Sequence, residues 1–310
     1  MTWIDDTVGQ IGVGAIGRIY ARHLVAGGHE LVVFDRDQRA LDELGLEVTV
    51  EASPSELAAR CGIVVLALPD PRAVEQVMFG DGGVLTGARA GTIVVDLSTV
   101  GPGTSRAIHA RASERGVHYL DAPVSGGKPM SCGVEGAEAG NVTFMVGGDA
   151  EAFADARPVM ELLGEVFLHV GPSGAGSTVK IISNLLSGVY TLVAAEAFAL
   201  GARAGFTPAQ LLEVLRETDG RSFFMTDYLV PRFERDELDP GFSIELQLKD
   251  HRLAAELAHE LEVPLPFNAI AIQLYELMRA HGLGGRDVSA ALPFASSAVK
   301  TELVRSEAVA

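Results

Sequence analysis

The sequence predicts an α/β protein, with a doubly wound sheet in the first half of the chain and an all-helical second half. Up to residue 175 short apolar runs alternate with helical patterns, and after residue 205 only helical patterns recur. Between them Gly176–Gly205 has glycines at both ends and no proline, and its length suits one helix of about seven turns. We therefore expect domains at 1–175 and 205–310, joined by an interdomain helix over 176–204.

Composition narrows the classes of function. The chain has 310 residues, 48% of them apolar, and a net charge of −17, which argues against nucleic-acid binding. No apolar run long enough to span a bilayer lacks a charge or glycine, and the N-terminus carries acids where a secretory signal has lysines. Cys61 and Cys132 form no CxxC motif, as is typical of reduced cytosolic thiols. We expect a cytoplasmic protein without nucleic-acid or membrane partners.

The first elements form a βαβ unit with a glycine-rich turn. Val8–Val13 reads as a buried strand that runs into Gly12–Gly17, a GxGxxG motif containing Ala15 and Ile16, and Arg18–Ala26 reads as a helix. Gly12 allows a tight turn, Gly14 lets the backbone approach a pyrophosphate, and Gly17 lets the helix pack on the strand. Because the helix N-terminus then faces the phosphates, the motif predicts a Rossmann-type dinucleotide site; another glycine-rich turn is the alternative.

The next strand, Leu31–Phe34, ends in an acid that bears on the cofactor. Asp35 lies about twenty residues beyond the glycines, where a carboxylate holds the adenine-ribose hydroxyls and repels the phosphate of NADP. Arg36 follows directly and suits that phosphate. The sequence favours NAD and leaves NADP possible.

Later strands end at the same edge of the predicted sheet. Ile63–Leu68 is followed by Pro69, and Ile93–Leu97 by Ser98 and Thr99. Since loops after strand C-termini line the ligand crevice of such sheets, we expect Leu68 and Pro69 near the cofactor. A proline-rich turn without ligand contact is the alternative.

The strand Val117–Leu120 leads into a glycine-rich loop. Ser125, Gly126 and Gly127 offer backbone N–H groups and one hydroxyl at one point, which suits a carboxylate; an ordinary flexible loop has the same composition. We expect the last strands at Val142–Val146 and Val166–Val170, separated by a helix over Glu151–Leu163.

The second half reads as helices. Thr207-Pro208 opens one through Arg216, Ser243–Leu261 forms another that carries Lys249-Asp250, and Pro266–Ala280 a third. His251 and His259 lack metal-ligand spacing, so we expect no metal site.

Many ordered blocks together resemble one family. The chain is similar to the β-hydroxyacid dehydrogenases, the group of 3-hydroxyisobutyrate dehydrogenase and tartronate semialdehyde reductase, from about Val8 to Leu292. The matching blocks are IGVGAIG, VFDR, LALPD, VVDLST, LDAPVSGG, GAEAGNVTFMVGG, GPSGAGSTVKIISN, LQLKD and GRDVSAAL. The resemblance implies a Rossmann domain with an added strand pair, an all-helical C-terminal domain, a homodimer or homotetramer, and NAD(P)-dependent oxidation of a small hydroxyacid.

The resemblance also implies roles for single residues. Lys180 matches the family's catalytic lysine, and Asn184, four residues on, matches the asparagine that helps to hold the substrate. Ser125, Gly126 and Gly127 match the loop that binds the substrate carboxylate. Thr99 and Lys249 match positions that contact the cofactor. For Lys180 taken alone, a lysine with its stem on apolar surface and its head in water is the alternative, and for Lys249-Asp250 a solvated helix face.

One feature leaves the substrate open, and two other functions are alternatives to hydroxyacid oxidation. The segment Lys128–Gly133 is longer than the family pattern, which affects which hydroxyacid fits rather than the chemistry. Imine reductases share the architecture and usually replace the lysine, so Lys180 argues against that activity. A nicotinamide-binding regulator without catalysis is a third possibility, and it needs neither Lys180 nor the Ser125–Gly127 loop.

Overall fold

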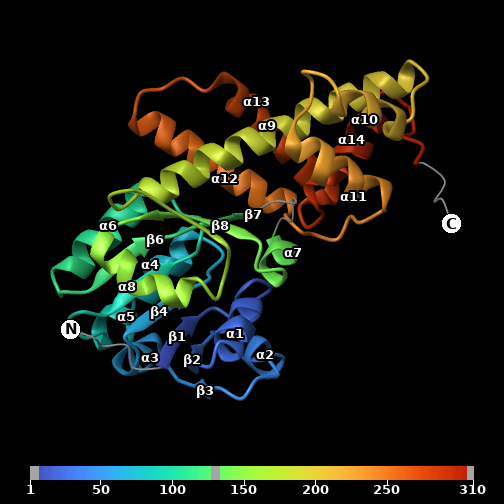
Figure 1. Ribbon diagram of the computed structural model, residues 1–310. Coiled ribbons are helices and arrows are strands. Elements are labelled where there is room, and N and C mark those ends of the chain that lie inside the picture. The colour runs from blue at the N-terminus through green and yellow to red at the C-terminus, as the bar shows by residue number, and fades with distance from the viewer. Residues whose placement is uncertain (1–6, 127–132, 306–310) are drawn as a thin grey trace. The chain divides into compact units, whose positions relative to one another are not determined.

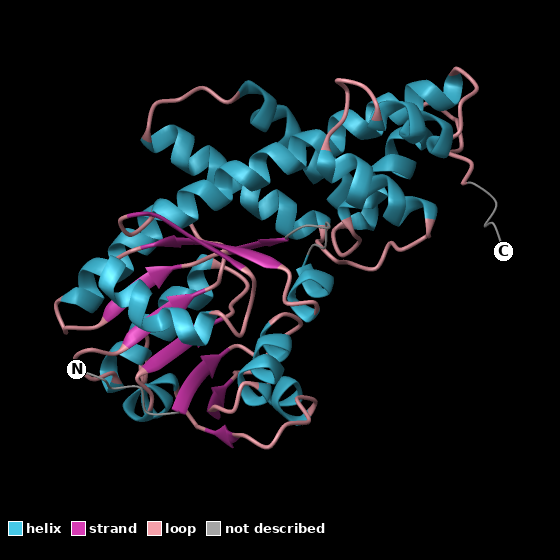
Figure 2. Ribbon diagram, in the orientation of Figure 1, coloured by secondary structure: helices cyan, strands magenta, loops and turns pink. Residues whose placement is uncertain are grey.

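The structure is a computed structural model that describes residues 7–126 and 133–305. The chain divides into two compact units, and the division falls between Lys180 and Ile181, inside one long helix. Each unit is described below by itself. Figure 2 shows that the strands belong to the first unit and that the second is built from helices.

The first unit contains one mixed sheet (Figure 1). Its strands are β1 (Thr7–Ile11), β2 (Glu30–Phe34), β3 (Thr49–Val50), β4 (Ile63–Leu66), β5 (Ile93–Asp96), β6 (His118–Asp121), β7 (Val124–Gly126), β8 (Val142–Gly147) and β9 (Val166–Gly171). Six parallel strands run in the order β3-β2-β1-β4-β5-β6. The order reverses direction between β1 and β4, which is where doubly wound sheets bind ligands.

The last three strands extend the sheet beyond β6. β8 runs antiparallel to β6 and β7 and parallel to β9. The sequence predicts β8 and β9, but it predicts a loop at Ser125-Gly126, and that prediction is wrong. Ser125 and Gly126 lie in β7, opposite Thr143 and Val142 of β8. Pairing to a neighbouring strand outweighs the turn preference of the glycine, and Gly127 lies outside the described residues.

Helices cover both faces of this sheet. They are α1 (Gly17–Ala26), α2 (Gln38–Asp42), α3 (Pro54–Arg60), α4 (Pro71–Phe79), α5 (Val84–Gly87), α6 (Pro102–Ser113), α7 (Gly133–Glu138) and α8 (Ala150–Met160). Alternate strand residues serve the two faces: Val65 and Val95 pack in a cluster with α1 and α8, whereas Val64 and Val94 pack with α3, α4 and α6. Central strands buried on both faces explain the continuous apolar runs of the sequence.

The sequence places helix starts at Ser53-Pro54 and at Thr207-Pro208, and both helices begin there. The Ser53 side chain accepts a hydrogen bond from Glu56 N at the start of α3, and Pro54 occupies the first turn. Thr207 and Gln210 form a reciprocal capping box at the start of α10. These bonds satisfy N–H groups that a helix cannot pair internally.

The long helix α9 (Ala175–Arg203) matches the predicted interdomain helix to within about two residues, the usual scatter of helix ends. By length and composition it could cross a membrane, although Lys180, Gly188 and Glu196 interrupt its apolar residues, as expected from the sequence. The same features suit the core helix of a soluble protein. Helix α9 also carries apolar side chains on its exposed face, namely Ile182, Leu186, Val193 and Leu200.

The second unit is helical. After α9 come α10 (Pro208–Arg216), the π-helical turn η1 (Met225–Leu229), α11 (Val230–Glu234), α12 (Ile244–Glu260), α13 (Pro266–Met278), the π-helical turn η2 (Arg279–Leu283), the 3₁₀ turn η3 (Val288–Ala290) and α14 (Ala291–Ala298). One apolar cluster joins them, with Phe198, Tyr228, Leu248 and Tyr275 fully buried. The sequence did not predict η1, α11 or η3 as separate elements.

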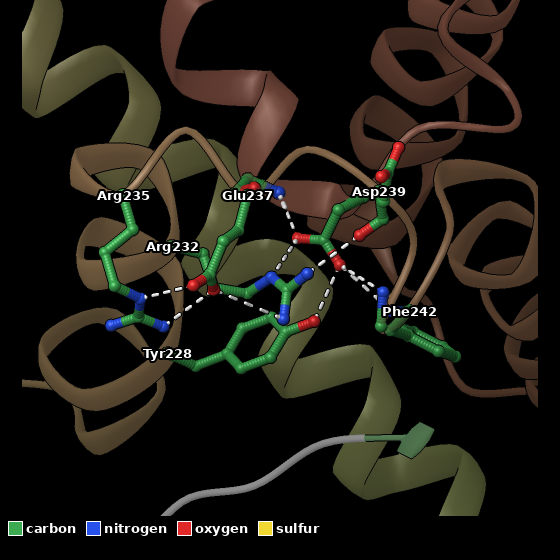
Figure 3. A network of polar contacts seen from close by, with 9 residues as sticks. Tyr228, Arg232, Arg235, Glu237, Asp239 and Phe242 are labelled. Atoms are coloured by element: carbon green, nitrogen blue, oxygen red, sulfur yellow. Dashed lines mark hydrogen bonds and ion pairs between the residues drawn. The ribbon is translucent and has the colours of Figure 1, made fainter. Parts of the chain in front are cut away.

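A buried ionic network fixes the loop that leads into α12 (Figure 3). Asp287 is fully buried and accepts hydrogen bonds from the hydroxyl of Tyr228 and from Phe242 N. Arg232, 5% exposed, lies 3.6 Å from Asp287 and donates to the carbonyl of Asp239 at 2.8 Å. The network leads directly into Ser243, whose side chain caps α12.

Candidate active site

In the glycine turn after β1, Gly12 and Gly17 pack closely against backbone atoms, whereas Gly14 is open to solvent. Gly12 has φ +91°, and a Cβ there would lie 2.4 Å from the carbonyl oxygen of Ala67. A Cβ on Gly17 would lie 2.1 Å from the carbonyl oxygen of Gly12, so helix α1 packs on the turn as the motif predicts. Gly14 and Ala15 are exposed and Ile16 is half-buried, and among the described residues none beyond its chain neighbours comes within 4 Å of the Cβ position of Gly14. The backbone at Gly14 is therefore free for close approach by a ligand.

A buried glutamine that sequence reasoning could not explain holds this turn. Gln10 is fully buried in β1, and its Nε2 donates to the carbonyl oxygens of Gly12 at 3.1 Å and Gly17 at 2.5 Å. One amide group therefore ties together the first and last glycines of the motif. A polar residue two positions before a GxGxxG turn was the signal that could have suggested this role.

Asp35 connects the end of β2 to the same turn. Its Oδ2 accepts a hydrogen bond from Val13 N at 2.8 Å, and its Oδ1 accepts one from Asp37 N at 2.9 Å. Asp35 is half-buried and Arg36 is exposed. The carboxylate thus lies at the glycine turn, where the sequence places it.

The ends of β4 and β5 are linked by a side chain. Ser98 Oγ accepts a hydrogen bond from Leu68 N at 3.0 Å. Leu68 and Thr99 are half-buried and Pro69 is exposed. All three lie next to this hydrogen bond and keep part of their surface accessible to a ligand. These residues, the open turn at Gly14 and the carboxylate of Asp35 fit a nicotinamide dinucleotide, with the pyrophosphate at the N-terminus of α1.

Two buried carboxylates lie side by side at the ends of β5 and β6. Asp96 and Asp121 are register partners and each is 1% exposed. Asp96 accepts hydrogen bonds from the hydroxyl of Tyr119 at 2.6 Å and from Ser98 N at 2.9 Å. Burial, opposed by these bonds and reinforced by the charge of Asp121, raises the pKa of Asp96 to about 6.

Asp121 binds the start of α9. Its Oδ1 accepts from Gly174 N and its Oδ2 from Ser177 N, both at 2.8 Å. Burial raises the pKa of Asp121, and these two backbone bonds oppose the rise. The sequence blocks VVDLST and LDAPVSGG contain Asp96 and Asp121, but neither acid had an assigned role from the sequence.

Lys180 lies on the second turn of α9 and is buried, with 8% of its surface exposed. That value contradicts the alternative of a lysine head standing in water. Asn184, one helical turn further on, is 6% exposed. Burying a lysine is costly unless other groups compensate for its charge. A buried lysine is therefore a candidate for a functional residue.

The surroundings of Asn184 determine the orientation of its amide. Its Nδ2 donates to Asp250 Oδ2 at 2.5 Å, and Asp250 Oδ1 forms an ion pair with Lys249 Nζ at 2.9 Å. Asp250 is 1% exposed, so Lys249-Asp250 is not simply a solvated helix face. Because a carboxylate accepts only, Asn184 must turn its NH₂ group to Asp250 and keep its Oδ1 for another donor.

No metal cluster appears within residues 7–126 and 133–305. His251 is fully buried, and its Nδ1 lies 2.6 Å from Asn268 Oδ1. Burial lowers the pKa of His251, and the hydrogen bond to Asn268 opposes this. The structure therefore places His251 in the helical core, with its Nδ1 engaged by Asn268.

A dinucleotide turn at the switch point of a doubly wound sheet, a buried lysine at the start of the long helix α9 and a helical unit after it are typical of NAD(P)-binding oxidoreductases. Residues 7–171 match the family described as the NAD binding domain of 6-phosphogluconate dehydrogenase. Residues 174–295 match the one described as NAD-binding of NADP-dependent 3-hydroxyisobutyrate dehydrogenase. The chain belongs to the family of 3-hydroxyisobutyrate dehydrogenases and related hydroxyacid dehydrogenases, which confirms the resemblance and the predicted fold class.

Individual relatives agree with this assignment. The chain is 38% identical to 2-(hydroxymethyl)glutarate dehydrogenase of Eubacterium barkeri, over 92% of this chain and 93% of that one. It is 36% identical to 3-hydroxyisobutyrate dehydrogenase of Pseudomonas aeruginosa, over 86% and 90%. The solved 3-hydroxyisobutyrate dehydrogenase of Mycobacterium tuberculosis with L-serine has 31% identity and a TM-score of 0.84, over 92% and 97%. An imine reductase of Bacillus cereus, at 18% identity and a TM-score of 0.60, shares the fold alone.

Proposed function

We propose that this protein is an NAD(P)-dependent dehydrogenase of a small β-hydroxyacid, with NAD the favoured cofactor. The observation that carries the proposal is the buried Lys180 one helical turn from Asn184, whose amide orientation Asp250 determines. Membership of the hydroxyacid dehydrogenase family supports it. When bound, the nicotinamide supplies the hydride acceptor.

Lys180 removes the hydroxyl proton as the carbinol is oxidised, and returns it in the reverse direction. Asn184 offers its Oδ1 as an acceptor, so it binds a proton donor, which is either the substrate hydroxyl or the ammonium group of Lys180. Ser125, Gly126 and Gly127 bind the substrate carboxylate and so determine which carbon reacts.

The cofactor residues follow from the first unit. We propose that Gly12, Gly14, Ala15, Ile16 and Gly17 hold the pyrophosphate. Asp35 holds the adenine ribose, with Arg36 beside it. Leu68, Pro69, Thr99 and Lys249 make the remaining cofactor contacts.

The proposal is tested with a panel of 3-hydroxyisobutyrate, glycerate, L-serine, L-threonate, 4-hydroxybutyrate and 2-(hydroxymethyl)glutarate, each with NAD and NADP. Reduced nicotinamide is followed by absorbance. Lys180→Met keeps most of the side-chain stem and removes the amine, and Lys180→Ala removes both. We expect each variant to bind cofactor and to lose at least about 100-fold in kcat, since general acid–base catalysis contributes that much.

Lys300→Ala, which removes an exposed lysine, is the matched control and should retain activity. Near-normal kcat in Lys180→Met would remove Lys180 from the chemistry. Cofactor binding with no oxidation across the panel would favour a regulator. Reduction of a cyclic imine by NADPH would favour an imine reductase.

We also propose a cytoplasmic homodimer or homotetramer. Ile182, Leu186, Val193 and Leu200 form an exposed apolar stripe on α9 at helical spacing, and α13 exposes Phe267 and Ile270. Apolar area of this kind marks interaction sites, and a second copy of the chain fits it. A monomer by light scattering after size-exclusion chromatography would contradict this.

A further inference from the structure

We propose that Asp121 is a positioning residue for Lys180, because its carboxylate fixes the first turn of the helix that carries the lysine. The inference rests on the proposed function for the role of Lys180. The two carboxylate oxygens bind two different backbone N–H groups, those of Gly174 and Ser177, which lie three residues apart. Lys180 follows Ser177 by three residues on the same helix.

The geometry of this contact leaves the helix little freedom. The first N–H groups of a helix have no internal partner, and a carboxylate is the acceptor that the positive end of the helix dipole favours. Each oxygen of Asp121 takes one N–H at 2.8 Å. A bidentate clamp of this kind fixes both the axial position and the rotation of the first turn, and a single bond would leave the rotation free.

Close backbone packing at two glycines reinforces the clamp. A Cβ on Gly176 would lie 2.2 Å from the carbonyl oxygen of Met145 and 2.4 Å from that of Asp121. A Cβ on Gly147 would lie 2.7 Å from Asp121 Oδ1. The start of α9 therefore lies directly against β6 and β8, and a shift of the turn would carry Lys180 with it. The hydroxyl of Ser177 adds a 2.8 Å hydrogen bond to Ser105 Oγ.

Asp96 provides a matched comparison on the neighbouring strand. Both carboxylates are buried to the same degree and occupy the same register. Asp96, however, has one N–H donor, Ser98 N, and its other hydrogen-bond partners are the hydroxyls of Tyr119 and Ser98. A hydroxyl can also accept, so an asparagine at 96 could accept from the N–H with its oxygen and donate to a hydroxyl with its NH₂ group. An asparagine at 121 could satisfy one N–H group and would direct its NH₂ at the other.

The test therefore compares Asp121→Asn with Asp96→Asn in the full-length protein. We expect Asp121→Asn to lower kcat about 10- to 100-fold, the range that small misplacements of a catalytic group produce, with the Kd for NAD unchanged. Asp96→Asn should stay within about 3-fold of wild type, or about 0.7 kcal/mol.

A double-mutant cycle separates positioning from general damage. If Asp121 acts through Lys180, Asp121→Asn should cause no further loss in kcat when Lys180 is already methionine. If Asp121→Asn lowers kcat by the same factor in Lys180→Met as in wild type, the proposal is overturned. A wild-type kcat in Asp121→Asn would overturn it as well. If Asp121→Asn does not fold, Gly174→Ala replaces it in the cycle. Gly174 has φ +89°, so alanine strains one of the two clamp donors and leaves the charge in place.

Failure of the proposed function is distinguishable from failure of this inference. If wild type oxidises no hydroxyacid, hydrogen exchange over residues 172–183 still tests the clamp. Faster exchange there in Asp121→Asn, and not in Asp96→Asn, supports it, and equal protection in both variants overturns it.

Discussion

The charge of Asp96 should cost the protein stability at neutral pH, and Asp96→Asn should remove that cost. Burial, opposed by hydrogen bonds from Ser98 and Tyr119, raises the pKa of Asp96 from 3.8 to about 6. Between those two values the unfolded chain has lost the proton that the folded protein keeps. Because the folded state binds more protons there, the free energy of unfolding falls as pH rises through this window.

The size of the effect follows from the two pKa values. A difference of about two units corresponds to about 3 kcal/mol once both states are ionised. Much of this loss of stability occurs below pH 5, close to the isoelectric point of about 4.8, where the protein is least soluble. Between pH 5 and pH 7.5 the same two values leave a change of about 1.4 kcal/mol, which is measurable.

The assay compares wild type with Asp96→Asn by urea unfolding at pH 5, 6, 7 and 7.5. Hydrogen exchange at the backbone amides of β5 and β6 measures the stability of the first unit, which contains Asp96. Groups remote from Asp96 titrate equally in both proteins, and the influence of the Asp121 charge is contained in the pKa of about 6. The difference in unfolding free energy should therefore shift by about 1.4 kcal/mol in favour of the variant as pH rises. Asp155→Asn, on the exposed side of α8, controls for loss of a surface charge. Parallel curves for wild type and Asp96→Asn would refute the reasoning.

Three further substitutions test other parts of the structure. Asp35→Ala should reduce the preference for NADH over NADPH in fluorescence titrations, and tighter NADPH binding by wild type would contradict the role of Asp35. Asp287→Ala should lower the free energy of unfolding by about 3–5 kcal/mol, because it removes the buried carboxylate beside Arg232 and leaves the exposed Glu237 as its acidic partner; a change below about 1 kcal/mol in urea unfolding would be inconsistent with this. Gly188→Ala should destabilise by about 1–3 kcal/mol, since its Cβ would lie 2.1 Å from His251 Nε2; an unchanged melting temperature would show that the helices can separate there.

The sequence predicted the order of the elements well because local signals determine them. The glycine turn, the Ser53 and Thr207 caps and the long helix all depend on residues within a few positions of one another. The strands of the parallel sheet were recognisable because burial on both faces makes them continuously apolar.

Contacts between distant residues were not predictable in the same way. β7 forms because β8, sixteen residues further on, pairs with it, and no pattern within Val124–Gly126 requires a strand. The partner of Asn184 lies 66 residues along the chain, so the sequence could give the amide a place on the helix without giving it an orientation. Residue type and spacing indicate which groups take part in the chemistry, and long-range hydrogen bonds determine which atom each group presents.

Asp96 and Asp121 illustrate why the same residue in the same local pattern can serve different purposes. Each ends a buried strand, and each follows apolar residues in the sequence. What separates them is the number of backbone N–H groups that the nearby chain directs at each carboxylate: one for Asp96, whose other partners are hydroxyls, and two at the start of α9 for Asp121. An asparagine has one acceptor oxygen, so it can satisfy the first arrangement and not the second. The need for a charge at a buried position therefore depends on how many of its partners can only donate, and Asp121 binds two such N–H groups where Asp96 binds one.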